Sequence, residues 1–115
     1  MDFFRIPREA YTATKGFYDQ TLTREKNAQL EMGLVSLAHI DCDLYKSTLS
    51  CLQFVQENLQ QGTVILFDDY YCCQGNLGMG ESGAFSEWLS GHPEWTANRW
   101  FDYSIHGKAF ILTRP

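Results

Sequence analysis

Two apolar runs on either side of an amphipathic stretch constrain the fold of this chain most strongly. The run "LVSLAHID" (34–41) is almost continuously apolar and rich in strand-forming residues, which predicts a strand buried on both faces. The run "TVILFDD" (63–69) predicts a second strand of the same kind. The residues between them carry side chains at helical spacing that form one largely apolar stripe: Tyr45, Thr48, Leu49, Leu52, Val55 and Leu59. A strand, a helix and a strand in this order predict a right-handed βαβ unit whose two strands are parallel.

Both ends of the predicted helix carry typical signals. Asp43 suits the N-cap position and Gly62 suits the left-handed position after the last turn, so we expect a helix of about five turns between them. Elsewhere the sequence predicts a short strand (10–16), a helical turn within 17–33, a mobile glycine-rich loop (70–83), a second helix (83–93) and a hairpin of two strands (96–115). The expected fold class is therefore α/β, a parallel βαβ unit with an antiparallel C-terminal hairpin at the sheet edge, in one domain covering residues 1–115.

Charge and composition exclude several classes of function. The net charge is −5, and the nine basic residues are scattered along the chain, so we expect no nucleic-acid binding. No apolar stretch approaches the roughly 20 residues of a membrane span, so we expect no membrane partner. The four cysteines lack zinc-site spacing, and no secretory signal begins the sequence. A cytoplasmic protein with free thiols is the simplest interpretation.

Four acidic residues stand where the two predicted parallel strands end. Asp41 and Asp43 follow the first strand, and Asp68 and Asp69 close the second. Because ligands of parallel α/β sheets bind beyond the carboxyl ends of the strands, we expect these four side chains to crowd together. Crowded carboxylates repel one another, and a hard divalent cation such as Mg²⁺ is the usual compensation. An acid that does not bind the cation could act as a general base. A non-catalytic module, whose acids only bind a cation or cap helices, stays open as an alternative.

An apolar strand ending in D-x-D followed by a strand ending in D-D also occurs in haloacid-dehalogenase-type phosphatases. That family has Thr or Val where this chain has Tyr45, and it carries a Ser/Thr and a Lys motif between its acidic strands. Asp41 and Asp68 stand too close in the sequence to hold those motifs, so this phosphotransferase function ranks second. A D-x-D glycosyltransferase ranks lower, because it offers no role for the second acidic pair.

Three segments resemble the macrocin O-methyltransferase (tylosin-type) family of class I S-adenosylmethionine-dependent methyltransferases, which act on sugar hydroxyls. They are "KGFYDQTL", "HIDCDLYKST" and "GTVILFDDYY", and the resemblance runs from Lys15 to Arg114. By motif position it implies Mg²⁺ on Asp41, Asp68 and Asp69, with Asp43 as the general base. It also implies S-adenosylmethionine as cofactor, a small hydroxylated molecule as substrate, and a doubly wound Rossmann-like sheet that ends in a hairpin.

The resemblance is confined to the C-terminal half of the family's domain, from about its third strand onward. The chain has no E/D-x-G-x-x-x-G turn for the cofactor's methionine part, and no preceding strand that ends in a ribose-binding acid. We therefore expect a partial sheet that lacks the first strands, and weak or no binding of S-adenosylmethionine by these residues alone. The preferred explanation is a piece of a longer reading frame, and the alternative is a shortened product that forms a homo-oligomer through the open edge of its first strand.

Overall fold

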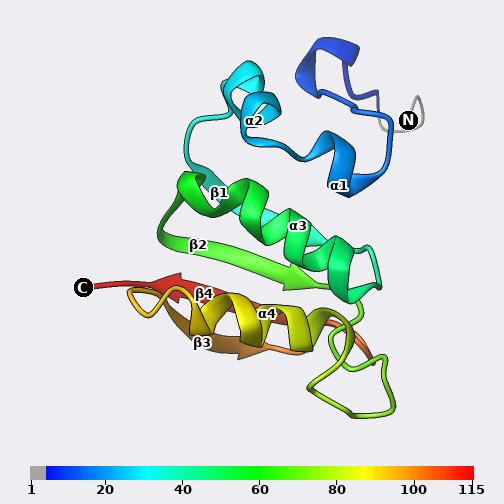
Figure 1. The fold of residues 1–115 in the computed structure, drawn as a ribbon, viewed down its shortest axis with the longest axis vertical. Helices are drawn as coiled ribbons and strands as arrows, with labels where there is room; N and C mark the ends of the chain where they lie inside the picture. The colour runs from blue at the N-terminus through cyan, green and yellow to red at the C-terminus, as the bar shows by residue number, and fades with distance from the viewer. Residues whose placement is uncertain (1–4) are drawn as a thin grey trace.

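The computed structural model describes residues 5–115 (Figure 1). Its helices and strands are, in chain order, the 3₁₀ turn Arg8–Ala10, α1 (Tyr18–Thr21), α2 (Arg24–Leu30), β1 (Val35–Ile40), α3 (Tyr45–Val55), the 3₁₀ turn Gln56–Asn58, β2 (Leu59–Phe67), α4 (Gly80–Ser90), β3 (Thr96–Phe101) and β4 (Lys108–Thr113). None of the helices in this part of the chain has the length and apolar character needed to cross a membrane.

The four strands form one mixed sheet in the order β1-β2-β4-β3. β1 and β2 are parallel, with Ile40 opposite Phe67, and α3 connects them. β4 is antiparallel to both β2 and β3. The predicted α/β class, the parallel βαβ unit and the C-terminal hairpin are therefore confirmed.

One face of the sheet carries the core. α3 and α4 lie side by side over this face (Figure 1). Leu52 from α3 packs there with an aromatic cluster in which Phe85 of α4 lies 4.7 Å from Phe67 of β2 and 5.0 Å from Phe110 of β4, between ring centroids. Burial of such large side chains is a major source of stability, so this cluster holds α4 against the middle of the sheet.

The opposite face of β1 is open, and here the prediction of a strand buried on both faces is wrong. Ile40 is buried, but Leu37 on the other face of the strand is 57 % exposed. Successive side chains of a strand point to opposite faces. A strand with a nearly continuous apolar sequence therefore has two apolar faces, and α3 and α4 cover only one of them.

The predicted N-cap is also wrong. α3 begins at Tyr45 after Leu44, and no side chain caps its first turn. Asp43 instead adopts the left-handed backbone conformation, with φ of +64°, in the short connection between β1 and α3. Asp tolerates this conformation better than most residues, because its short polar side chain can hydrogen-bond locally.

The C-terminal end of the predicted helix is wrong as well. α3 ends at Val55, and β2 begins at Leu59, so Gly62 lies inside a strand with φ of +91°. The register between β1 and β2 shifts at this level, and the buried Thr63 hydroxyl donates to the carbonyl oxygen of Val35 at 2.6 Å. Pairing with β1 therefore overrides the local helix-ending signal.

Two smaller boundaries differ from the predictions. Residues 10–16 form no strand, and the following segment contains the short helices α1 and α2, which contact α3. α4 starts at Gly80 rather than residue 83, so it takes in the end of the predicted loop. This shift brings one further acid, Glu81, into the first turn of a helix that points at the strand ends.

Candidate functional site

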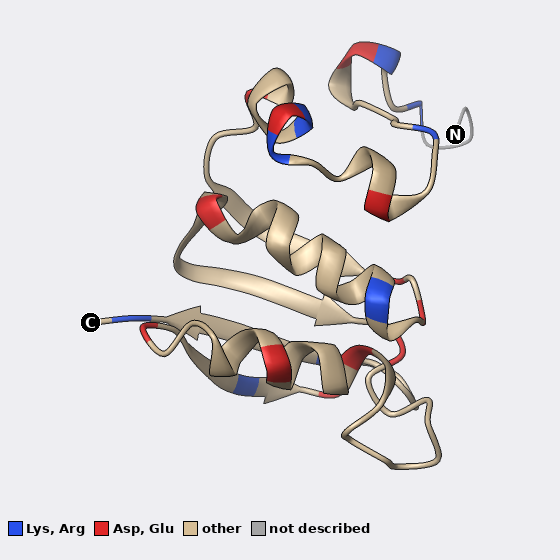
Figure 2. Cartoon of the chain, in the orientation of Figure 1, with Lys and Arg blue, Asp and Glu red and all other residues tan. Residues whose placement is uncertain are grey.

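Acidic residues gather where β1 and β2 end and α4 begins (Figure 2). The two strands are parallel neighbours, and the amide of Asp68 donates to the carbonyl oxygen of Ile40 at 3.0 Å, which extends their pairing by one residue. The carboxyl ends of both strands therefore meet at one edge of the sheet, as the βαβ prediction requires.

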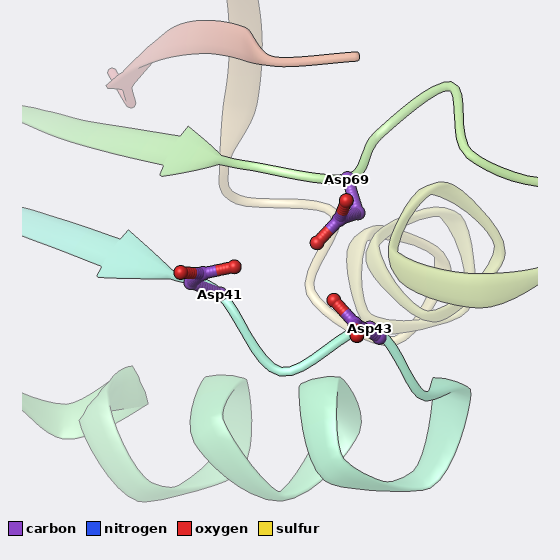
Figure 3. A group of neighbouring side chains, drawn as sticks. All are labelled: Asp41, Asp43 and Asp69. Atoms are coloured by element: carbon purple, nitrogen blue, oxygen red, sulfur yellow. The ribbon is translucent and has the colours of Figure 1, made fainter.

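Three of the four predicted site residues come together there (Figure 3). Asp41 at the end of β1, Asp43 in the connection to α3 and Asp69 beyond β2 turn their side chains toward one another. Each offers a carboxylate oxygen, and these oxygens all lie within 4.8 Å of one another. Asp41 and Asp43 are exposed and Asp69 is half-buried, so an ion could enter from solvent.

The fourth predicted residue, Asp68, points elsewhere. Its Oδ1 accepts a hydrogen bond from the hydroxyl of Tyr103 at 3.2 Å and lies 3.6 Å from Nε2 of His39. Burial, the charge of Asp68 and this hydrogen bond together raise the pKa of Tyr103. Asp68 and Asp69 lie in the turn that follows β2, so their side chains need not share a direction.

The three converging carboxylates carry uncompensated negative charge. No Lys or Arg side chain within residues 5–115 comes within 4.0 Å of any of them, since the ion pairs there are Arg24–Glu57 and Lys108–Asp102. Hydrogen bonding to the Asp43 carboxylate, then burial and the neighbouring acids, raise the pKa of Asp69 to about 7. Carboxylates crowded in this way favour a shared proton or a bound cation between them.

The donor set fits a hard cation. Mg²⁺ binds carboxylate oxygens at about 2.0–2.1 Å, so opposite ligands stand about 4.2 Å apart and adjacent ligands are closer. Oxygens that lie within 4.8 Å of one another need only small rotations of exposed side chains to reach that geometry. Asp41 and Asp69 belong to this set both by motif position and by geometry, whereas Asp43 belongs to it by geometry alone.

Sequence reasoning missed Glu81, which lies under the acidic cluster. Its side chain is fully buried, and its two oxygens accept backbone N–H groups from Cys42, Asp43 and Asp69. Burial raises the pKa of Glu81, and the three N–H groups partly offset that rise. The only sequence signal was an acid within a glycine-rich stretch, which a solvent-exposed loop would explain equally well.

A second polar group ties the segment after Asp69 to the hairpin. The ammonium of Lys108 is largely buried and donates to the hydroxyl of Tyr71 and to Asp102, both at 2.9 Å. These two hydrogen bonds raise the pKa of Lys108. The amide of Tyr71 donates in turn to the carbonyl oxygen of His106 at 3.1 Å. The chain beyond β2 is thus held on one side by the hairpin and on the other by α4.

The described residues do not form a cradle for S-adenosylmethionine. The connection from β1 to α3 has no glycine, and the glycine-containing loop follows β2, the strand that ends in the acidic pair. A glycine-rich turn after a strand lets the backbone approach a cofactor closely, and none stands beside β1 on its open edge. The described site therefore has carboxylate oxygens that could hold a cation, without the cofactor turn.

The fold is similar to that of solved methyltransferases. The O-methyltransferase NovP superposes with a TM-score of 0.64 at 20 % identity, over 86 % of this chain and 36 % of that one. CalS11, described as a TDP-rhamnose 3'-O-methyltransferase of calicheamicin biosynthesis, superposes with a TM-score of 0.65 at 22 % identity, over 85 % of this chain and 39 % of that one. The chain thus spans less than two fifths of the length of either structure. Among curated proteins, none matches the chain.

A family model gives a more specific result than these structures. The model of the macrocin O-methyltransferases (TylF) matches residues 4–79, which is more than half of the chain. The matched segment contains Asp41, Asp43, Asp68 and Asp69, and it ends before Glu81. The sequence and the mixed α/β sheet agree: the chain belongs to the macrocin O-methyltransferase (TylF) family.

Proposed function

We propose that this chain supplies the cation-binding and proton-accepting part of a Mg²⁺- and S-adenosylmethionine-dependent O-methyltransferase that acts on a hydroxyl group of a small sugar-containing molecule. The observation that carries the proposal is the convergence of Asp41, Asp43 and Asp69 at the carboxyl ends of two parallel strands. Membership of the TylF family supports the reaction class, and the sugar-nucleotide enzyme CalS11 supports the substrate class.

The proposed roles follow the motif positions. Asp41, Asp68 and Asp69 bind Mg²⁺, and Asp43 accepts the proton of the substrate hydroxyl. Bound Mg²⁺ supplies charge that lowers the pKa of a coordinated hydroxyl and fixes its orientation. For Asp68 this requires its carboxylate to turn away from Tyr103 and toward Asp41. Asp43 already lies beside the other two acids, within reach of a hydroxyl bound between them.

S-adenosylmethionine supplies the methyl group in this proposal. The described residues contain no turn that would hold it, so we derive no contact with it from this chain. Asp43 removes the proton, and the hydroxyl oxygen becomes a better nucleophile; positioning of the oxygen by the cation adds to the rate. A calorimetric titration with S-adenosylmethionine is expected to give weak or no binding to these 115 residues.

Titration of Mg²⁺ into four single variants tests the assignment of roles. Asp41→Asn and Asp69→Asn should each weaken Mg²⁺ binding by about tenfold or more, because each removes a charged ligand. Asp68→Asn should do the same, while Asp43→Asn should bind Mg²⁺ nearly as well as the wild type. If Asp43→Asn weakens Mg²⁺ binding and Asp68→Asn does not, Asp43 is a ligand, and its role as the base is refuted.

The alternative functions give different outcomes. A chain that binds no Mg²⁺ at millimolar concentration would not be a cation-dependent enzyme part. Release of phosphate from a phosphate monoester, dependent on Asp41, would favour the phosphotransferase alternative. A chain that binds Mg²⁺ but does not support methyl transfer when combined with the other segments of a homologous enzyme would favour a non-catalytic cation-binding module.

A further inference from the structure

Glu81 is the one fully buried carboxylate in the part of the chain that the structure describes. It is the second residue of α4. Its Oε2 accepts the N–H groups of Cys42 and Asp43, both at 3.2 Å, and its Oε1 accepts the N–H of Asp69 at 2.9 Å. One side chain therefore bonds to the backbone of both acidic segments, which lie in the loops after β1 and β2.

The contacts of Glu81 differ from those of an ordinary buried acid. Buried carboxylates are usually paired with Lys or Arg, because an unpaired charge in the interior is costly. Within residues 5–115, no Lys, Arg or His side chain comes within 4.0 Å of the Glu81 carboxylate, and its partners are backbone N–H groups alone.

The backbone of Glu81 is held firmly in this position. Gly80 has φ of +58°, and a Cβ on it would lie 3.0 Å from Sγ of Cys73 and 3.5 Å from the carbonyl oxygen of Asp43. Four residues further along α4, Phe85 is buried in the aromatic core. The start of α4 is thus packed against both acidic segments, and the Glu81 side chain has little freedom to withdraw from them.

We propose that Glu81 is a positioning residue that joins the two acidic loops, so that their carboxylates converge on one cation. Its oxygens accept backbone N–H groups, and they are not among the carboxylate oxygens that converge on the candidate cation site. The inference rests on the proposed function, because it assumes that the acids bind a cation. It adds a residue outside the segment that matches the family model, and it gives the start of α4 a role in the site.

Two substitutions separate the effect of the length of the Glu81 side chain from the effect of its charge. Glu81→Gln keeps the length but places an amide NH₂ against a backbone N–H, and it removes the charge. Glu81→Asp keeps the charge but is one methylene too short to bond both loops. Glu87→Gln is the matched control, because Glu87 lies on the same helix and its carboxylate accepts a hydrogen bond from Tyr45 at 2.8 Å.

The readouts are Mg²⁺ affinity by calorimetry and amide hydrogen exchange at Cys42, Asp43 and Asp69, all on the full 115-residue chain. Both Glu81 variants should bind Mg²⁺ about tenfold or more weakly, as supporting residues around metal sites typically require, and the Glu87 control should match the wild type. The three amides should exchange slowly in the wild type and faster in both variants. Wild-type Mg²⁺ affinity in both folded Glu81 variants would overturn the proposal.

The two readouts keep this proposal distinct from the proposed function. A wild type that binds no Mg²⁺ but protects the three amides would refute the cation site and leave Glu81 as a purely structural link, which also overturns the positioning role. A wild type that binds Mg²⁺ but exchanges these amides as fast as exposed loops would overturn the role of Glu81 and leave the cation site standing. If Glu81→Gln fails to fold, the Mg²⁺ affinity of Glu81→Asp and the wild-type exchange rates decide whether Glu81 has the positioning role.

Discussion

Asp43→Asn should make the cation-free protein more stable. Asp43 faces two other carboxylates, Asp41 and Asp69, with oxygens within 4.8 Å. Two unit charges at about that distance repel by about 1 kcal/mol in water, so the two pairs amount to about 2 kcal/mol. Screening by 0.15 M salt lowers the expected gain to about 1–2 kcal/mol. Asn also tolerates the left-handed backbone that Asp43 adopts, so the substitution adds no backbone strain.

The stability gained by Asp43→Asn should depend on pH in a defined direction. The pKa of Asp69 is raised in the folded state from 3.8 to about 7. A group with a raised folded pKa stabilises the protein fully below its unfolded pKa, and this contribution is lost as the pH rises through the folded pKa. The wild type should therefore lose stability between about pH 4 and pH 7. Because Asp43 is the main cause of the shift, the Asn variant should lose much less.

Thermal unfolding at pH 5 and pH 8 in the presence of a chelator checks both points. At pH 8 the Asn variant should melt roughly 4–8 °C above the wild type. At pH 5 Asp69 is protonated, so its repulsion of Asp43 is absent and the difference should fall to about half. Mg²⁺ should raise the melting temperature of the wild type at pH 8 by relieving the same repulsion. Glu94→Gln, which removes an exposed acid from the turn before β3, is the control and should change little. An Asn variant that melts no higher than the wild type at pH 8, or equally higher at both pH values, would refute the electrostatic reasoning.

Two further predictions concern the packing that holds the site. Phe67→Ala should lower the free energy of unfolding by about 3–5 kcal/mol in a urea titration, because Phe67 is fully buried, while Phe101→Ala should cost far less because Phe101 is 46 % exposed. Equal losses would argue against the assigned core. Gly83→Ala should destabilise by about 1–3 kcal/mol despite the better helix propensity of Ala, because its Cβ would lie 2.5 Å from the carbonyl oxygen of Gly78. Gly91→Ala is the control, since its Cβ has ordinary contacts, and a stabilising Gly83→Ala would show that α4 does not start as described.

The sequence predicts the strand–helix–strand unit and the hairpin because their signals are local and repeated. The apolar stripe from Tyr45 to Val55 has helical spacing, and the two apolar runs are long enough to be strands. Once β1 and β2 are parallel neighbours, the meeting of their carboxyl ends follows from topology alone. The gathering of acids at this edge was therefore predictable without any tertiary information.

The helix boundaries were less predictable because distant contacts compete with local signals. Asp43 has the residue type of an N-cap, but its amide bonds to Glu81, 38 residues further along the chain. Gly62 has the residue type of a helix end, but the hydroxyl of the adjacent Thr63 bonds to Val35 and keeps this segment in the sheet. In both places a contact between elements outweighs a preference worth about 1 kcal/mol.

The sequence by itself therefore determines that four acids stand at one edge of a parallel βαβ unit and that the chain carries the motifs of its family. Only the tertiary structure decides which of the four side chains meet. Asp69 joins Asp41 and Asp43, while Asp68, its neighbour in the chain, turns toward Tyr103. The physical reason is that side-chain direction depends on the local backbone, whose amides at Asp43 and Asp69 bond to a buried carboxylate from α4 that the sequence pattern did not single out.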